Sequence, residues 1–252
     1  MVSLIKLIQT GKLPLNQFMD LETVNWIKDH RPSFNISAPP INFNPNLNEY
    51  LSELKKYIPD PNWFLVSKKK DSIHGMRHII RVSFHSIHLT LLSEGKTSRF
   101  FKNCLVASSL HDLRRKNDLM DLYHGKRAAR WFKKNISLIE KQFEIHLSEE
   151  DIKAIYYSMS FHDLAYENIV NHIKYEQYKD LTDILKTADA LDRYRLPSVR
   201  LWFKDKYVSV IPSDFLKSMA FHLVVTSETK FLNGDTNVNS VLHAIEDFFR
   251  LI

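Results

Sequence analysis

The chain has 252 residues, of which 44% are hydrophobic and 25% are charged, a balance typical of a globular protein with a substantial core. Its single cysteine excludes an intramolecular disulfide framework, which fits a reducing cytoplasm. The sequence has neither a signal-peptide pattern nor an uncharged apolar run of about 18 residues, so we expect a cytoplasmic protein without a membrane segment. Glycine is scarce, with 5 residues, which favours helices over hairpin-rich sheets.

Positive charge is concentrated in one part of the chain. The net charge is +6, but residues 66–135 contain 16 Lys and Arg against 5 Asp and Glu, so this segment carries +11 and the remainder −5. Such an excess predicts attraction of a polyanionic substrate. For any single lysine, a solvated helix face is the simpler explanation.

The first 60 residues predict a helical extension followed by a connector. Apolar residues recur at helical spacing in residues 4–8 and 18–27. Residues 37–46 are rich in Pro and Asn, which disfavour helix and predict an ordered connector. We therefore expect an extension over residues 1–60 and a main domain over residues 61–252.

The main domain shows one helical pattern after another, so the sequence predicts an all-α bundle with short helical extensions at both ends. A serine cap and three acidic residues mark one helix start at Ser148. The expected helices span residues 73–92, 98–111, 121–132, 148–163, 175–196, 213–229 and 238–250.

Histidine and aspartate residues recur on these helices in a pattern that suggests a metal site. Imidazole nitrogens and carboxylate oxygens bind Mn, Fe, Ni, Co or Zn, and Mg is also compatible with carboxylates. A helical bundle can direct such side chains toward one interior point. Four of the residues could hold one ion, whereas all six could hold two, with Asp112 suited to bridge them. The six candidates are His78, His111, Asp112, Asp189, His124 and His162.

The order of these residues resembles the HD-domain metal-dependent phosphohydrolase superfamily over about residues 63–197. Three segments carry the resemblance: HGMRH at residues 74–78 with its helix, HDLRR at 111–115 followed by HG at 124–125, and KTADALDR at 186–193. These motifs are similar to an uncharacterised bacterial branch. The resemblance implies an HD-domain-like helical bundle with His78, His111, Asp112 and Asp189 as ligands of the first metal. It places His124 and His162 where two-metal members have further histidines.

Two departures from the motifs of characterised branches narrow the range of possible substrates. The Gly-Tyr-Pro signature of the cyclic-di-GMP phosphodiesterase branch is absent. The ppGpp hydrolase branch continues its His-Asp pair with threonine, whereas this chain has Leu113 and Arg114. Neither substrate is assigned.

The resemblance implies a hydrolase that cleaves a phosphate monoester or diester of a nucleotide-like molecule with metal-activated water. We expect Asp112, Arg114 and Arg115 to act in catalysis. Basic side chains near the ligands could bind the phosphate: Arg114, Arg115, Lys126, Arg127 and Arg193. For Arg193, an ion pair with Asp189 or Asp192 is an equally favoured reading.

Two other functions fit the sequence. One is a single-strand nuclease, suggested by the local charge and by Trp63, Phe64 and Trp131 as base-stacking residues. The other is a catalytically silent nucleotide-binding sensor that acts through the terminal extensions. The oligomeric state is left open.

Overall fold

The computed structural model describes residues 2–35, 47–91 and 97–251, and over these ranges it is helical and contains no strand. The predicted all-α fold is confirmed. The predicted connector at residues 37–46 lies outside the described residues. The α-helices are α1 (Leu4–Gln9), α2 (Leu21–Asp29), α3 (Leu47–Lys56), α4 (Met76–Leu91), α5 (Ser98–Leu110), α6 (His124–Lys134), α7 (Ile136–Phe143), α8 (Glu149–Phe161), α9 (Ile173–Gln177), α10 (Lys179–Leu191), α11 (Asp214–Leu232) and α12 (Asn237–Arg250).

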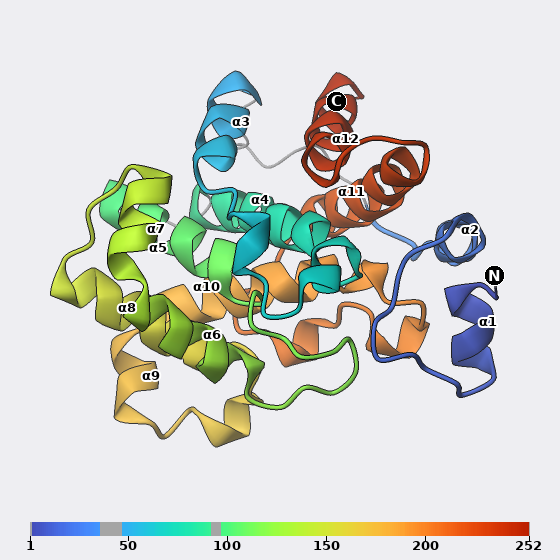
Figure 1. Ribbon diagram of the computed structural model, residues 1–252. Helices are drawn as coiled ribbons and strands as arrows, with labels where there is room; N and C mark the ends of the chain where they lie inside the picture. Colours follow the sequence, from blue (N-terminus) through green and yellow to red (C-terminus); the bar gives the residue numbers. More distant parts are fainter. Residues whose placement is uncertain (1, 36–46, 92–96, 252) are drawn as a thin grey trace.

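Helix α4 lies at the centre of the molecule. Every residue from Met76 to Thr90 is buried, as expected for a helix that other helices surround. It packs against α5, α10, α11, α12 and α3 (Figure 1). Several of its buried side chains are charged or titratable, and they need partners from the surrounding helices.

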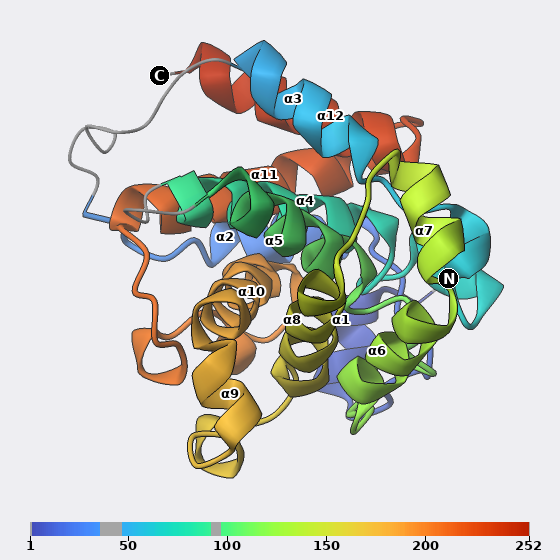
Figure 2. The ribbon, with the colours of Figure 1, turned by 90° about the vertical axis from the view of Figure 1, so that its left-hand side faces the viewer.

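The helices form layers around α4. Figure 2 shows α3 and α12 at the top, α11, α4 and α5 beneath them, and α10, α8 and α6 lower still. The described parts of residues 1–60 belong to the same hydrophobic core as the rest of the chain, since Leu4, Val24 and Tyr50 pack into it. The extension is therefore continuous with the main core in this structure.

Local sequence explains where the site-forming helices begin and end. Ser148 caps α8, as predicted: its hydroxyl accepts from the Asp151 amide, and the Asp151 carboxylate accepts from the Ser148 amide. Helices α5 and α8 both end at a His-Asp pair, with His111 and His162 at the C-cap positions. Both pairs therefore leave their helix ends toward the interior.

Among the described residues, no helix is long and apolar enough to cross a membrane.

Candidate metal centre

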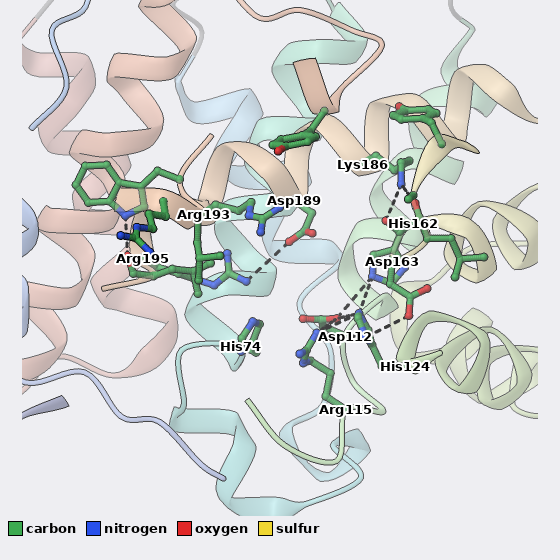
Figure 3. Close-up of a pocket in the computed structure, with 18 of the residues that line it drawn as sticks. His74, Asp112, Arg115, His124, His162, Asp163, Lys186, Asp189, Arg193 and Arg195 are labelled. Atoms are coloured by element: carbon green, nitrogen blue, oxygen red, sulfur yellow. Dashed lines mark hydrogen bonds and ion pairs between the residues drawn. The ribbon is translucent and has the colours of Figure 1, made fainter. Parts of the chain in front are cut away.

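The six side chains predicted as metal ligands converge from five helices. All are buried except Asp189, whose side chain is 30% exposed. Figure 3 shows Asp112, His124, His162 and Asp189 around one space. Their positions are His78 in the first turn of α4, His111 and Asp112 directly after α5, His124 at the start of α6, His162 directly after α8 and Asp189 in the last turn of α10.

The first group of ligands consists of His78, His111, Asp112 and Asp189. The Nε2 atom of His78 lies 3.2 Å from Nε2 of His111 and 3.4 Å from Oδ2 of Asp112. Oδ1 of Asp189 is 3.4 Å from Nε2 of His78 and 4.0 Å from Nε2 of His111. Ligand atoms from helices α4 and α10 and from the end of α5 thus face one another.

The second group consists of Asp112, His124 and His162. Oδ1 of Asp112 lies 3.0 Å from Nε2 of His124 and 3.7 Å from Nε2 of His162. The two imidazole Nε2 atoms are 3.1 Å apart. Asp112 therefore faces His78 with Oδ2 and the second group with Oδ1, so its carboxylate lies between the two groups. His111 lies 4.0 Å from Oδ1.

The four imidazoles are all oriented through their Nδ1 atoms. His111, His124 and His162 each approach the backbone carbonyl three residues earlier at 2.7–2.8 Å, namely the carbonyls of Ser108, Asp121 and Met159. His78 instead approaches Oδ2 of Asp192 at 2.7 Å. Because a carbonyl or carboxylate oxygen only accepts, each Nδ1 carries the proton. In the neutral imidazole with this tautomer, Nε2 is the lone pair directed at the centre, as in metal-binding histidines.

A buried charge network supports His78. Asp192 accepts from Arg81 at 2.6 and 3.1 Å, and Arg81 also donates to Glu228 of α11 at 2.8 Å. Arg77 donates to the same Glu228 at 2.9 Å. These side chains are almost fully buried, so their mutual pairing offsets the cost of removing charge from water. Helix α11 thereby fixes the orientation of His78, a predicted ligand on α4.

Burial and charge determine the protonation of the ligands. Burial lowers the pKa of His111 to about 3, so its imidazole is neutral and free to bind a cation. Burial alone would raise the pKa of Asp112, but Arg115, His124 and His111 more than offset it and hold this pKa well below its usual range. Asp189 is likewise kept ionised, with its pKa lowered to about 2 by His78 and Arg195 against the effect of burial.

These ligands fit a divalent transition metal. Pairs of Nε2 atoms face each other at 3.1 and 3.2 Å, and two lone pairs at such a distance repel unless a proton or a metal cation lies between them. Oδ1 of Asp112 is buried without a hydrogen-bond partner, which is costly for a carboxylate oxygen. The two groups, His78–His111–Asp112 and Asp112–His124–His162, could hold one or two ions, and the nitrogen-rich set favours Mn, Fe, Ni, Co or Zn over Mg.

The second group depends on a glycine. A β-carbon added to Gly125 would lie 2.3 Å from the Met159 carbonyl oxygen and 2.6 Å from Nδ1 of His162. Both atoms belong to the hydrogen bond that orients the His162 ring. Gly125 therefore allows α6 to approach the end of α8 closely enough to bring His124 beside His162.

The centre opens into a cavity of about 600 Å³, within the size range of small-molecule sites. Acidic and imidazole groups of the centre line one side (Figure 3). The basic side chains that line the cavity are Arg115, Lys186, Arg193, Arg195, Arg200 and Lys206, and its larger apolar and aromatic residues include Leu164, Tyr166, Leu196, Leu201, Trp202 and Tyr207.

The predicted substrate-binding residues separate into two sets. Arg115 and Arg193 line the cavity. Arg115 also lies 3.1 Å from Nε2 of His124. Arg114 points away from the cavity, donates to the Trp63 carbonyl at 2.9 Å and lies over the Trp131 ring. Arg127 binds Asp121 and the carbonyls of Arg114 and Leu122, whereas Lys126 is exposed on α6 outside the cavity lining.

The aromatic residues considered for base stacking belong to the core. Trp63 and Phe64 are buried, and the rings of Trp63 and Trp131 lie 5.3 Å apart. Trp131 packs against the core from its edge. None of the three lines the cavity.

Several cavity residues were not singled out from the sequence. Arg195, rather than Arg193, lies within 4.0 Å of Asp189 and Asp192, because the α10 helix gives way to the 3₁₀ helix η4 (Asp192–Arg195) and the angular spacing changes. Lys186 donates to the carbonyls at the end of α8. Burial lowers the pKa of Lys186 to about 8. Asp163 can be found from the sequence, because it belongs to a second His-Asp pair. Its Oδ1 atom is buried without a hydrogen-bond partner.

Comparisons with known proteins identify no relative of this chain: no protein-family model, no curated protein and no solved structure matches it.

Proposed function

We propose that this protein is an HD-type metal-dependent phosphohydrolase that cleaves a phosphate monoester or diester of a nucleotide-like substrate. The observation that carries the proposal is that both carboxylate oxygens of Asp112 lie close to buried histidine Nε2 atoms. Oδ2 lies 3.4 Å from Nε2 of His78, and Oδ1 lies 3.0 Å from Nε2 of His124. One or two divalent ions held by these residues would supply the Lewis acidity that phosphoryl chemistry uses. The cationic cavity beside the centre suits a phosphate group.

The chain's own residues have distinct tasks in such a reaction. A bound divalent cation supplies Lewis acidity and makes water nucleophilic at neutral pH. Arg115 lines the cavity and lies 3.1 Å from Nε2 of His124, so it can hold oxygens of the phosphate that is cleaved. Asp163 presents a buried, unpaired Oδ1 at the same cavity, so it can accept a proton from the attacking water.

The test is ester hydrolysis by metal-stripped protein reconstituted separately with Mn, Co, Ni, Mg and Zn. A generic phosphate monoester and a generic diester serve as substrates. The variant Asp112→Asn removes the shared charge, and Glu149→Gln, at an exposed surface acid, is the matched control. We expect metal-dependent turnover in wild type and control and none in Asp112→Asn.

The same experiment addresses the alternatives. Cleavage of labelled single-stranded DNA or RNA that is lost in Asp112→Asn would indicate a nuclease. Bound metal with tight nucleotide binding, but no turnover of any ester with any metal, would refute the hydrolase and indicate a sensor.

A further inference from the structure

The cavity beside the metal centre has a set of basic side chains from one segment of the chain. The segment that follows α10 contains η4, η5 (Val199–Leu201) and η6 (Asp205–Tyr207), and it contributes Arg193, Arg195, Arg200 and Lys206 to the cavity lining. Figure 3 shows Arg193 and Arg195 on one side of Asp189, with His162, Asp163 and His124 on the other. The basic side chains and the metal centre line one cavity.

In the part of the chain that the structure describes, the positive charge of Arg195, unlike that of the other members of this set, is compensated by nearby carboxylates. It is buried, donates to the Ile73 carbonyl at 2.8 Å, and lies 3.5 Å from Asp192 and 3.9 Å from Asp189. Its role is structural, since its charge offsets two acids of the centre. It is not available to a ligand.

Arg193 and Arg200 are uncompensated. Within the described ranges, no carboxylate oxygen lies within 4.0 Å of either guanidinium, and neither makes a side-chain hydrogen bond there, in contrast to the paired Arg77, Arg81 and Arg195. Lys206 lies over the Tyr207 ring with its ammonium 4.9 Å from the ring centre. Cations bound by Asp112 and Asp189 would consume the negative charge of the cavity and leave the basic side chains as its remaining charge.

Apolar and aromatic side chains also line the cavity. Leu201 and Tyr207 are 48% and 56% exposed, while the buried Trp202 is fixed by a hydrogen bond from its indole nitrogen to the Leu196 carbonyl. Such exposed apolar side chains beside a pocket provide a surface for a ligand's organic part. A cavity of about 600 Å³ is also far larger than one phosphate group requires.

We infer that the substrate carries a second phosphate group, joined to the first through a ring-sized organic body, as in a nucleoside bisphosphate. The phosphate to be cleaved lies at the metal centre, and the second phosphate binds Arg193, Arg200 and Lys206. The organic body contacts Leu201 and Tyr207. The first half of this inference rests on the proposed function, whereas the second phosphate site rests on the uncompensated cations alone.

Binding can be tested without turnover by using phosphonates, because their carbon–phosphorus bonds are not hydrolysed. The probes are benzylphosphonate and para-xylylene bisphosphonate, which share one aromatic ring and differ in the second phosphonate. Each is titrated calorimetrically into full-length protein reconstituted with Mn. The variants are Arg193→Gln/Arg200→Gln together, and Arg130→Gln, an exposed position on α6 outside the cavity lining, as control.

We expect wild type and Arg130→Gln to bind the bisphosphonate at least about tenfold more tightly than the monophosphonate, as two charge-assisted contacts would give. In the double variant, the affinity for the bisphosphonate should fall to the affinity for the monophosphonate. The affinity for the monophosphonate should stay unchanged. Equal binding of both probes by wild type, or a preference that survives in the double variant, would overturn the inference. Failure of the hydrolase proposal would be seen separately, as bisphosphonate preference in a protein that cleaves no ester.

Discussion

The two ligand groups differ in how their histidines are held, and the difference predicts how they bind metal. In the first group, the Nδ1 atom of His78 contacts a carboxylate that two arginines support. In the second group, His124 and His162 are oriented by the carbonyls at Asp121 and Met159. The Asp163 carboxylate lies 3.2 Å from Nδ1 of His124, farther than the 2.7 Å between Asp192 and His78. A carboxylate behind an imidazole raises its basicity more than a neutral carbonyl does. We therefore expect the first group to bind its ion more tightly.

The largest expected effect follows from the one residue the groups share. Asp112→Asn should abolish binding by the second group, which loses its only carboxylate, and weaken binding by the first group, which keeps the carboxylate of Asp189. His78→Gln should remove the tighter ion and His162→Gln the weaker one. Metal content after dialysis against a series of free Mn concentrations distinguishes these outcomes. Equal loss of bound metal in all three variants would show that the chain has a single metal site and would contradict a difference between the two groups.

The carboxylate behind His78 can be tested by itself. Asp192→Asn should weaken the tighter ion about 10- to 100-fold, as for other residues that orient metal ligands, and leave the weaker ion unchanged. The matched control is Glu228→Gln, which disturbs the same buried network one residue farther from the metal. Both variants should lower the unfolding midpoint, since each leaves Arg81 partly unpaired. Equal metal affinities in the two variants would contradict a specific role for Asp192.

Two other histidines of α4 provide a contrast in pH dependence. Burial lowers the pKa of His85 to about 3 and that of His88 to about 4. Below about pH 6.5 the unfolded chain binds protons that the folded chain does not, so the free energy of unfolding should fall as the pH drops from 6.5 toward 4. Both ring nitrogens of His85 lack a hydrogen-bond partner.

His85→Leu should therefore flatten this dependence, by up to about 1.4 kcal/mol per pH unit between pH 4 and 6, without loss of stability at pH 7. Urea unfolding of metal-free protein at several pH values measures the slope. An unchanged slope would mean that His85 is protonated in the folded state.

The smallest effect is expected at Arg114, which the sequence placed beside the substrate. Arg114→Gln should leave KM and kcat nearly unchanged and cost about 1 kcal/mol of stability, because its guanidinium contacts a carbonyl and an indole ring in packing. Arg115→Gln, at the neighbouring position, should instead raise KM for the phosphate ester. Steady-state kinetics of the two variants compare them, and a higher KM in Arg114→Gln would place both arginines at the site.

The sequence predicts much of this centre because its ligands lie at helix ends. Helical periodicity and the cap at Ser148 place the ends of α5 and α8 within a residue or two, so the His-Asp pairs that follow them are found by inspection. Residues 73–75 were expected to be helical, but α4 begins at Met76. Before that helix, Gly75 lies so close to the Lys69 and Lys70 carbonyls that a β-carbon would be 2.4 Å from each.

The supporting residues were harder to predict, since their partners are distant in the chain. Glu228 lies 147 positions from Arg81, and no local pattern joins them. Arg114 and Arg115 are consecutive, yet they point to different environments once the chain turns after α5. Whether a basic residue faces the cavity depends on a turn geometry that composition and periodicity do not specify.

Gly125 has a consequence for the ancestry of the fold. A β-carbon there would collide with both atoms of the hydrogen bond that orients His162. A lineage that keeps both ions must therefore keep glycine at this position. A homologue with alanine or a larger residue in its place should retain the equivalents of His78 and Asp189 while its counterparts of His124 and His162 drift. One position would then separate one-ion from two-ion descendants.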